Sequence, residues 1–293
     1  MEVFQQLING LSLGSIYALI ALGYTMVYGI IQLINFAHGD VLMVGAYVGW
    51  FSMTGLHLNV VEALLASMLT CAVLGVVIER VAYKPLRNSS RIAVLITAIG
   101  VSLFLEYTMM YFMGAKVRAY PDLPSYLAGS FTIGGVTIKT IQVTIVGISV
   151  LLMLGLQFIV KNTRVGKAMR AVSQDAEAAR LMGINVDTTI SLTFAMGSAL
   201  AGAAGVLWGV YYTSINPLMG IMPGLEAFVA AVLGGIGLIP GALIGAYIVG
   251  LLQTGAIALN LSLFRDAVVF VVLILILIIK PAGLLGKNVK EKV

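Results

Sequence analysis

The residues of this chain that are able to do chemistry are few, and their spacing matches no catalytic or metal-binding motif. His38 and His57 lie far apart and form no His-x-x-x-His pair. Cys71 is the only cysteine, so it cannot form an internal disulfide. The glycine–lysine pairs at 166–167 and 286–287 lack the other residues of a nucleotide-binding loop. We therefore expect no enzymatic reaction, no metal and no cofactor in this chain, and we expect any ATP to be bound by partner subunits.

The carboxylates that interrupt apolar stretches are the more informative groups. Glu106 falls well inside an apolar run, and Glu226 lies close to the start of another. Charged side chains inside a membrane are costly, and they mark either a transport pathway or a buried polar network. Both interpretations stay open for this pair. The other possible pathway positions are polar or aromatic residues in apolar surroundings, for which packing is the alternative: Asn9, Tyr17, Tyr24, Asn35 and His38.

The composition identifies the kind of scaffold that positions these groups. Of the 293 residues, 60% are hydrophobic and only 10% are charged, whereas a soluble globular protein has about 25% charged residues. This balance excludes a soluble enzyme, a disordered chain and a disulfide scaffold. Long unbroken apolar runs exclude a β-barrel, which needs short alternating segments. The sequence predicts an all-α, polytopic membrane helix bundle that forms a single domain over residues 1–293.

Each crossing of a bilayer needs about 20 apolar residues, and on this basis the chain is expected to have eight to ten spans. The string Gly-Gly-Ile-Gly-Leu-Ile-Pro-Gly at 234–241 interrupts a helix, so a broken or re-entrant segment is expected near 225–241. Small residues recur every four positions, as in Gly197, Ala201, Gly205 and Gly209, and this spacing lets helices pack closely in lipid. The candidate spans are 7–31, 41–55, 60–78, 92–113, 141–160, 190–212, 225–238, 242–259 and 267–279.

Basic residues concentrate in three segments, which are 80–91, the loop 161–187 and the tail 280–293. Lysine and arginine favour the cytoplasmic side, so all three segments are expected to face the cytoplasm, with the N-terminus outside. The segment 114–140 then forms an outer loop. Its run 131–138 predicts a small hairpin about two glycines. This loop is either a landing surface for a binding protein or an inert connection.

The cytoplasmic loop contains an amphipathic segment at 165–182. Val165, Ala168, Met169, Val172, Ala176, Ala179 and Met182 share one face of a single helix. Gly183 is placed to end this helix. Ser173 and Asp175 provide an alternative, in which the segment splits in two and Ser173 caps the second piece. Such a helix either lies on anionic lipid or docks into a groove of a soluble partner.

Several strings resemble a known family. They include Asn-Phe-Ala-His-Gly-Asp at 35–40, Gly-Gly-Ile-Gly at 234–237 and the stretch 79–87. Over nearly its whole length the chain is similar to the permeases of ATP-binding cassette importers for branched-chain amino acids, and its length resembles the smaller of the two paralogous permeases. Urea and amide permeases of the same superfamily look similar, so the substrate class stays open. A stand-alone secondary carrier is the alternative from another class.

Asp40 could cap the helix that begins at Val41.

The resemblance implies a multi-pass protein of the bacterial inner membrane. Its implied partners are a second paralogous permease, two ATP-binding cassette subunits, and a periplasmic or lipid-anchored amino-acid-binding protein, with no nucleic acid. It implies that the loop 161–187 couples the bundle to the ATPases. The residues expected to do so are Val165, Gly166, Lys167, Met169, Arg170, Asp175, Ala178, Ala179, Leu181 and Gly183.

Overall fold

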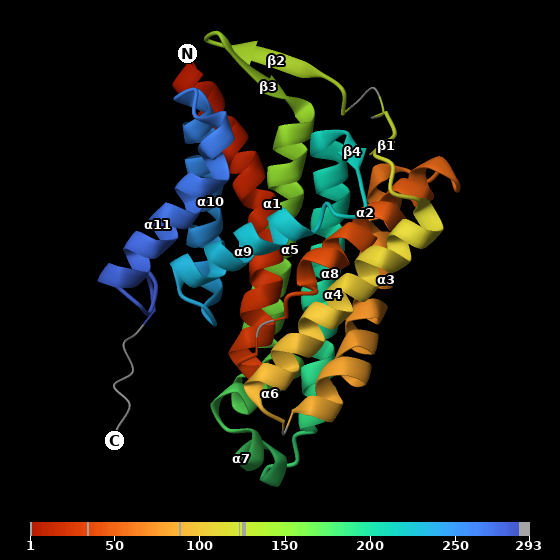
Figure 1. The fold of residues 1–293 in the computed structure, drawn as a ribbon, viewed down its shortest axis with the longest axis vertical. Helices are drawn as coiled ribbons and strands as arrows, with labels where there is room; N and C mark the ends of the chain where they lie inside the picture. The colour runs from red at the N-terminus through yellow and green to blue at the C-terminus, as the bar shows by residue number, and fades with distance from the viewer. Residues whose placement is uncertain (1, 34, 88, 123, 125–126, 287–293) are drawn as a thin grey trace.

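The computed structural model describes residues 2–33, 35–87, 89–122, 124 and 127–286, and these fold into a helical bundle (Figure 1). Seven helices in the described part of the chain are long and apolar enough to cross a membrane. They are α1 (Glu2–Ile31), α3 (Val60–Ile78) with its continuation to Leu86, α4 (Arg91–Met113), α5 (Thr140–Asn162), α8 (Val186–Tyr212), α10 (Ile239–Ala258) and α11 (Arg265–Ile279) with the preceding turn η3 (Ser262–Phe264).

Shorter elements connect and complete these spans. A π-helical turn η1 (Glu79–Tyr83) and a 3-10 turn η2 (Lys84–Leu86) extend α3. The remaining helices are α2 (His38–Thr54), α6 (Arg164–Gln174), α7 (Ala176–Leu181) and α9 (Ile221–Gly234). Four short strands are β1 (Arg118–Ala119), β2 (Ser130–Ile133), β3 (Val136–Lys139) and β4 (Ser214–Ile215). They form two antiparallel pairs, β1 with β4 and β2 with β3.

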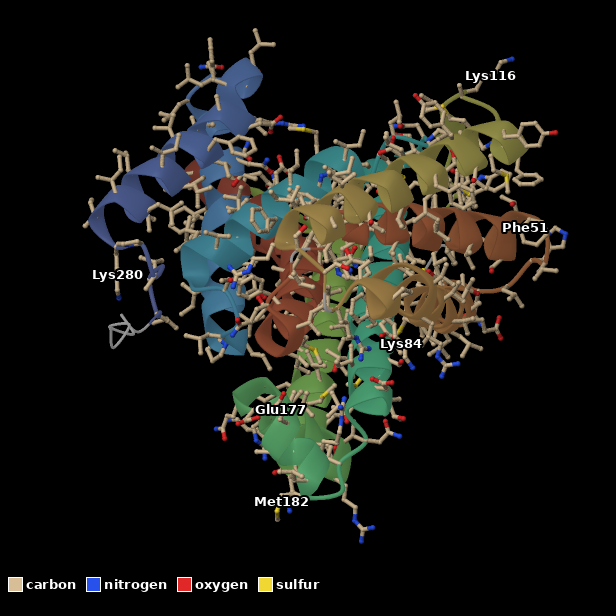
Figure 2. All side chains as sticks on the ribbon, turned by 60° about the horizontal axis from the view of Figure 1, so that its bottom comes forward. Phe51, Lys84, Lys116, Glu177, Met182 and Lys280 are labelled. Atoms are coloured by element: carbon tan, nitrogen blue, oxygen red, sulfur yellow. The ribbon has the colours of Figure 1, made fainter. Side chains whose placement is uncertain are left out.

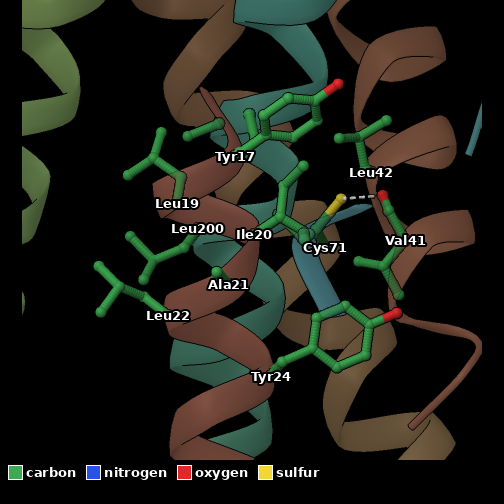
Figure 3. Packing of buried hydrophobic residues seen from close by; sticks show 14 of the residues in the cluster. Tyr17, Leu19, Ile20, Ala21, Leu22, Tyr24, Val41, Leu42, Cys71 and Leu200 are labelled. Carbon is green, nitrogen blue, oxygen red and sulfur yellow. Dashed lines mark hydrogen bonds between the residues drawn. The ribbon is translucent and has the colours of Figure 1, made fainter. Parts of the chain in front are cut away.

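The helices α1 and α8 form the centre of the bundle, because both are buried over most of their length. Helices α4, α5 and α11 are mostly exposed, as expected for surfaces that face lipid or another subunit. The interior beside α1 is filled by aliphatic and aromatic side chains, including Ile20 and Leu42 (Figure 3). Cys71 packs here as a buried small residue, with its thiol 3.5 Å from the carbonyl oxygen of Val41.

Glycines let the central helices approach to backbone contact. A Cβ atom on Gly250 of α10 would lie 2.6 Å from the carbonyl oxygen of Gly10 in α1. A Cβ atom on Gly205 of α8 would lie 2.2 Å from the carbonyl oxygen of Leu42 in α2. Real side chains do not approach this closely, so only glycine fits at these positions. The predicted close packing through small residues is confirmed, and these contacts lie within the chain.

Besides the loop helices α6 and α7, two helices inside the bundle are too short for a full crossing. Helix α2 has 17 residues and begins beside Gly23 and Tyr24, about two turns before α1 ends. Helix α9 has 14 residues. It begins in contact with Gly39, at the start of α2, and ends at the predicted glycine-rich break. The predicted broken segment near 225–241 is therefore present, and α2 is a second half-helix whose start lies inside the bundle.

The three basic segments lie at one end of the bundle as far as they are described. Lys84 pairs with Asp187 at 2.7 Å, so the 80–91 turn lies against the end of the 161–187 loop. The backbone nitrogen of Leu284 donates to the carbonyl oxygen of Leu233 at 2.8 Å, which holds the start of the tail at the end of α9. Residues 287–293 of the tail lie outside the described residues. The three basic segments therefore lie on one side of the bundle, as the distribution of lysine and arginine predicted.

The hairpin predicted in the outer loop is confirmed, and it lies at the opposite end, beside the start of α1 (Figure 1). Strands β2 and β3 pair about Gly134 and Gly135, whose positive φ angles of 58° and 81° suit a tight turn. The backbone nitrogen of Thr137 donates to the side chain of Gln5 at 3.0 Å.

Replacing Gly205 with alanine should destabilise the bundle by about 1–3 kcal/mol, since the added methyl group forces α8 away from α2. Gly155→Ala in α5 is the matched control, because nothing lies within 4 Å of the added Cβ. Thermal unfolding of both variants in detergent checks this. Equal melting temperatures for the two variants would contradict the packing described here.

Candidate functional site

The loop between α5 and α8 folds as two short helices that meet at Asp175. The carboxylate of Asp175 accepts hydrogen bonds from the backbone nitrogens of Glu177 and Ala178, both at 2.9 Å, and so caps α7. The expectation that Ser173 would be the cap is wrong, because its hydroxyl donates back to the carbonyl oxygen of Arg170 at 2.9 Å. Gly183 ends α7 with a φ of 82°, as predicted.

Helix α6 is fixed to the bundle by its apolar face. Met169 and Val172 are buried, and a Cβ atom on Gly166 would lie 2.1 Å from the carbonyl oxygen of Val160 at the end of α5. The guanidinium of Arg170 donates to the same carbonyl oxygen. Among the predicted coupling residues, Gly166, Met169 and Ala179 are buried in the chain, where they anchor the loop.

The tip of the loop exposes apolar side chains. Leu181 is 89% exposed and Met182 is 83% exposed, at the far end of the molecule from the hairpin (Figures 1 and 2). The expectation that Ala176 and Met182 share one face of a single helix with Met169 and Val172 is wrong, because Asp175 starts a separate helix and both residues are exposed. Val165 is half-buried, and the predicted coupling residues that remain exposed are Lys167, Arg170, Asp175, Ala178, Leu181 and Gly183.

A cluster of charged residues ties this loop to the turn after α3. The guanidinium of Arg87 contacts the carboxylate of Glu79, whose side chain is fully buried, and also that of Asp187 at 2.6 Å. Lys84 joins from the same turn, and the hydroxyl of Ser191 donates to Glu79 at 2.6 Å. This cluster was not predictable from local sequence, because its partners lie far apart in the chain and come together only through the fold.

The possible pathway residues separate into distinct places. Tyr17 donates to the carboxylate of Glu226 and lies 2.9 Å from the side chain of Gln253, which also bonds Glu226. Gln253 in turn contacts Asp266 at 3.1 Å. Tyr17 and Glu226 are thus engaged in a buried polar network between α1, α9, α10 and α11.

Asn35, His38 and Asn9 lie elsewhere. Asn35 is buried and accepts a hydrogen bond from the hydroxyl of Tyr83 at 2.9 Å. His38 is buried with its ring 4.8 Å from that of Tyr24. Asn9 accepts from the side chain of Gln142 at 2.8 Å and lines a cavity of about 850 Å³ beneath the outer loop.

A separate cavity of about 270 Å³ lies where the starts of α2 and α9 meet α4. Tyr24 and Glu106 line it, and so do two residues that were not among the possible pathway positions, Asp40 and Ser102. The expectation that Asp40 caps its helix is wrong, because α2 begins at His38 and places Asp40 in the first turn. Its carboxylate instead accepts from the hydroxyl of Ser102 at 2.5 Å.

Comparison with known proteins agrees with this architecture. Residues 6–278 match the family described as the permease component of branched-chain amino acid transport systems. The chain is 43% identical to the high-affinity branched-chain amino acid transport permease BraD of Pseudomonas aeruginosa and 44% identical to the LivH permease of Escherichia coli. Each alignment covers 99% of this chain and 97% of the relative.

More distant similarity reaches permeases for other cargo. The chain is 30% identical to the ribose import permease RbsC of Escherichia coli, over 93% of this chain and 84% of that protein. All of these relatives are transport permeases rather than enzymes. With its apolar helices and its match over almost the whole length, the chain is a multi-pass membrane protein that belongs to the family of permease components of branched-chain amino acid transport systems.

Proposed function

We propose that this chain is one permease subunit of an ATP-binding cassette importer that carries leucine, isoleucine and valine into the cell. The exposed two-helix loop carries this proposal, because it offers a rigid projection with an apolar tip, Leu181 and Met182, to a soluble partner. Two ATPase subunits bind ATP and dock beneath the bundle. A second, paralogous permease completes the pathway, and a periplasmic or lipid-anchored binding protein delivers the amino acid.

The arrangement of the loop favours docking over passive association with lipid. A lipid-bound amphipathic helix must turn its apolar face outward, toward the membrane. Here the apolar residues Met169 and Val172 of α6 are already covered by the chain itself. The apolar face of α6 is therefore not available to the membrane.

The proposed orientation in the membrane follows from the position of the three basic segments. The loop 161–187, the turn at 80–91 and the start of the tail share one end, and this end faces the cytoplasm if basic residues follow their usual bias. The N-terminus and the hairpin then lie outside, where the outer loop 114–140 provides a landing surface for the binding protein. ATP-driven closure of the ATPases moves the loop as a rigid body and switches the pathway between its two states.

The test is uptake by the complete assembly. This chain, the paralogous permease, the two ATPases and the binding protein are reconstituted in vesicles. We expect uptake of labelled leucine that requires ATP and the binding protein. Uptake driven by an ion gradient without the ATPases would favour a secondary carrier instead, and ATP-driven uptake of urea or short amides but not leucine would assign the chain to those substrates.

Removing the apolar tip should uncouple the assembly. Leu181→Ser takes away a side chain that is exposed in the free subunit, so stability should be unchanged, while leucine uptake should fall about tenfold if the tip is buried in the ATPase. Leu263→Ser, at another strongly exposed leucine in the turn before α11, is the matched control. Equal uptake by the two variants would argue against docking through this tip.

Breaking the charged cluster that joins the loop to the bundle should lower the stability of the subunit. Arg87→Gln leaves the carboxylate of Glu79 buried without its cation, which costs on the order of 3–5 kcal/mol for a buried pair. Arg91→Gln, at an exposed arginine nearby, is the control. Thermal unfolding of the purified subunit checks the stability, and a melting temperature for Arg87→Gln equal to that of the control would contradict the role given to this cluster.

A further inference from the structure

The starts of α2 and α9 meet inside the bundle, and neither start has a side-chain cap. Neither Ala37 before α2 nor Gly220 before α9 makes a side-chain capping bond. Gly39 and Gly220 pack backbone to backbone, since a Cβ atom on Gly39 would lie 2.4 Å from the carbonyl oxygen of Gly220. The backbone nitrogens of His38, Asp40 and Ile221 already donate to carbonyl oxygens of the preceding turns. What the two helix starts share is the partial positive charge of a helix N-terminus, which favours an anionic group.

The carboxylate of Asp40 adds an independent observation at the same place. Asp40 is 2% exposed and lines the cavity between α2, α4 and α9. Its Oδ2 atom accepts from the hydroxyl of Ser102, but no described residue donates a hydrogen bond to its Oδ1 atom. A buried carboxylate oxygen without a partner is costly, and a ligand that donates hydrogen bonds removes that cost.

A second carboxylate faces the same space. Glu106 lies one helical turn after Ser102 on α4, so both side chains project from the same side of that helix into the cavity. Asp40 and Glu106 are the acidic groups of this lining, and the described residues add no basic side chain to it. This lining favours a cationic hydrogen-bond donor, and an ammonium group can bond to both acidic side chains at once.

The rest of the cavity lining is mainly apolar. Phe36 and Leu103 contribute side chains to its wall, next to the polar groups. Its volume of about 270 Å³ lies at the lower end of the range for small-molecule pockets, which is about 300–1,000 Å³. The cavity thus combines three features. Its acidic side chains suit the ammonium group of an apolar α-amino acid, the two helix starts suit its carboxylate, and the apolar wall suits its side chain.

We propose that this cavity is a binding site for the transported amino acid, in which Asp40 and Glu106 bind its ammonium group. The partial positive charge at the starts of α2 and α9 attracts its carboxylate, and the apolar wall receives its side chain. This inference rests on the proposed function, because it supposes that the chain moves amino acids. The site needs no tight affinity, since a pathway must also release its cargo.

Charge removal tests the ammonium contact. In the complete reconstituted transporter, Asp40→Asn and Glu106→Gln should each lower leucine uptake by about tenfold or more, since a charge-assisted hydrogen bond to the substrate is lost. ATP hydrolysis stimulated by the binding protein should stay within about twofold of the parent, because the coupling loop is untouched. Glu62→Gln is the matched control, since glutamine preserves the capping box at the start of α3. Uptake equal to the control in both cavity variants would overturn the proposal.

Protection from alkylation tests binding without relying on transport. Leu103→Cys places a thiol at a 46% exposed position of the cavity wall, while the native Cys71 is fully buried and gives no background. In the assembled permease pair with its ATPases, leucine should slow labelling of this thiol by a maleimide several-fold. The same concentration of 4-methylpentanoate, which has the same carbon chain without the ammonium group, should not.

Equal protection by the two compounds, or protection by neither, would overturn the assignment. The two failures are distinguishable. If the parent assembly shows no ATP-dependent leucine uptake, the proposed function fails. If the parent transports leucine but the cavity variants and the protection assay show no effect, only the site is wrong. Protection by sodium chloride in place of leucine would identify the cavity as a cation site and would likewise overturn the proposal.

Discussion

The backbone contact between Gly39 and Gly220 is the constraint on which the interior of this protein depends. A helix that begins inside a membrane exposes backbone groups that lipid cannot satisfy, so such a start is tolerated only within protein or beside a polar cavity. Glycine at both positions brings the two half-helices, α2 and α9, together at their starts. Their meeting point lies against α1 and α4, and the cavity with Asp40 and Glu106 exists because of that meeting.

The rest of the bundle holds this meeting point in place. Helices α1 and α8 form a buried centre, and glycine contacts bind α1 to α10 and α8 to α2 without intervening side chains. The loop helix α6 is anchored on the end of α5, and the charged cluster around Arg87 fixes the turn after α3 to the start of α8. Packed side chains and an ion-pair cluster therefore connect the loop with the interior of the bundle.

The sequence predicted the parts of this structure that depend on local pattern. Apolar runs of span length located the long helices, the glycine-rich string at 234–241 located the break after α9, and Gly134–Gly135 located the hairpin turn. Partners distant in sequence were not predictable, because nothing local connects Arg87 with Asp187 or Asp40 with Ser102. The single-helix interpretation of 165–182 failed for a physical reason, since Asp175 satisfies two backbone donors and starts a new helix.

The structure of the assembled transporter, determined by cryo-electron microscopy, tests the central claim most directly. We expect residues 175–183 to be enclosed by an ATPase subunit, with the side chains of Leu181 and Met182 buried in its surface. A loop that stays in solvent while the ATPases contact another part of the chain would contradict the account.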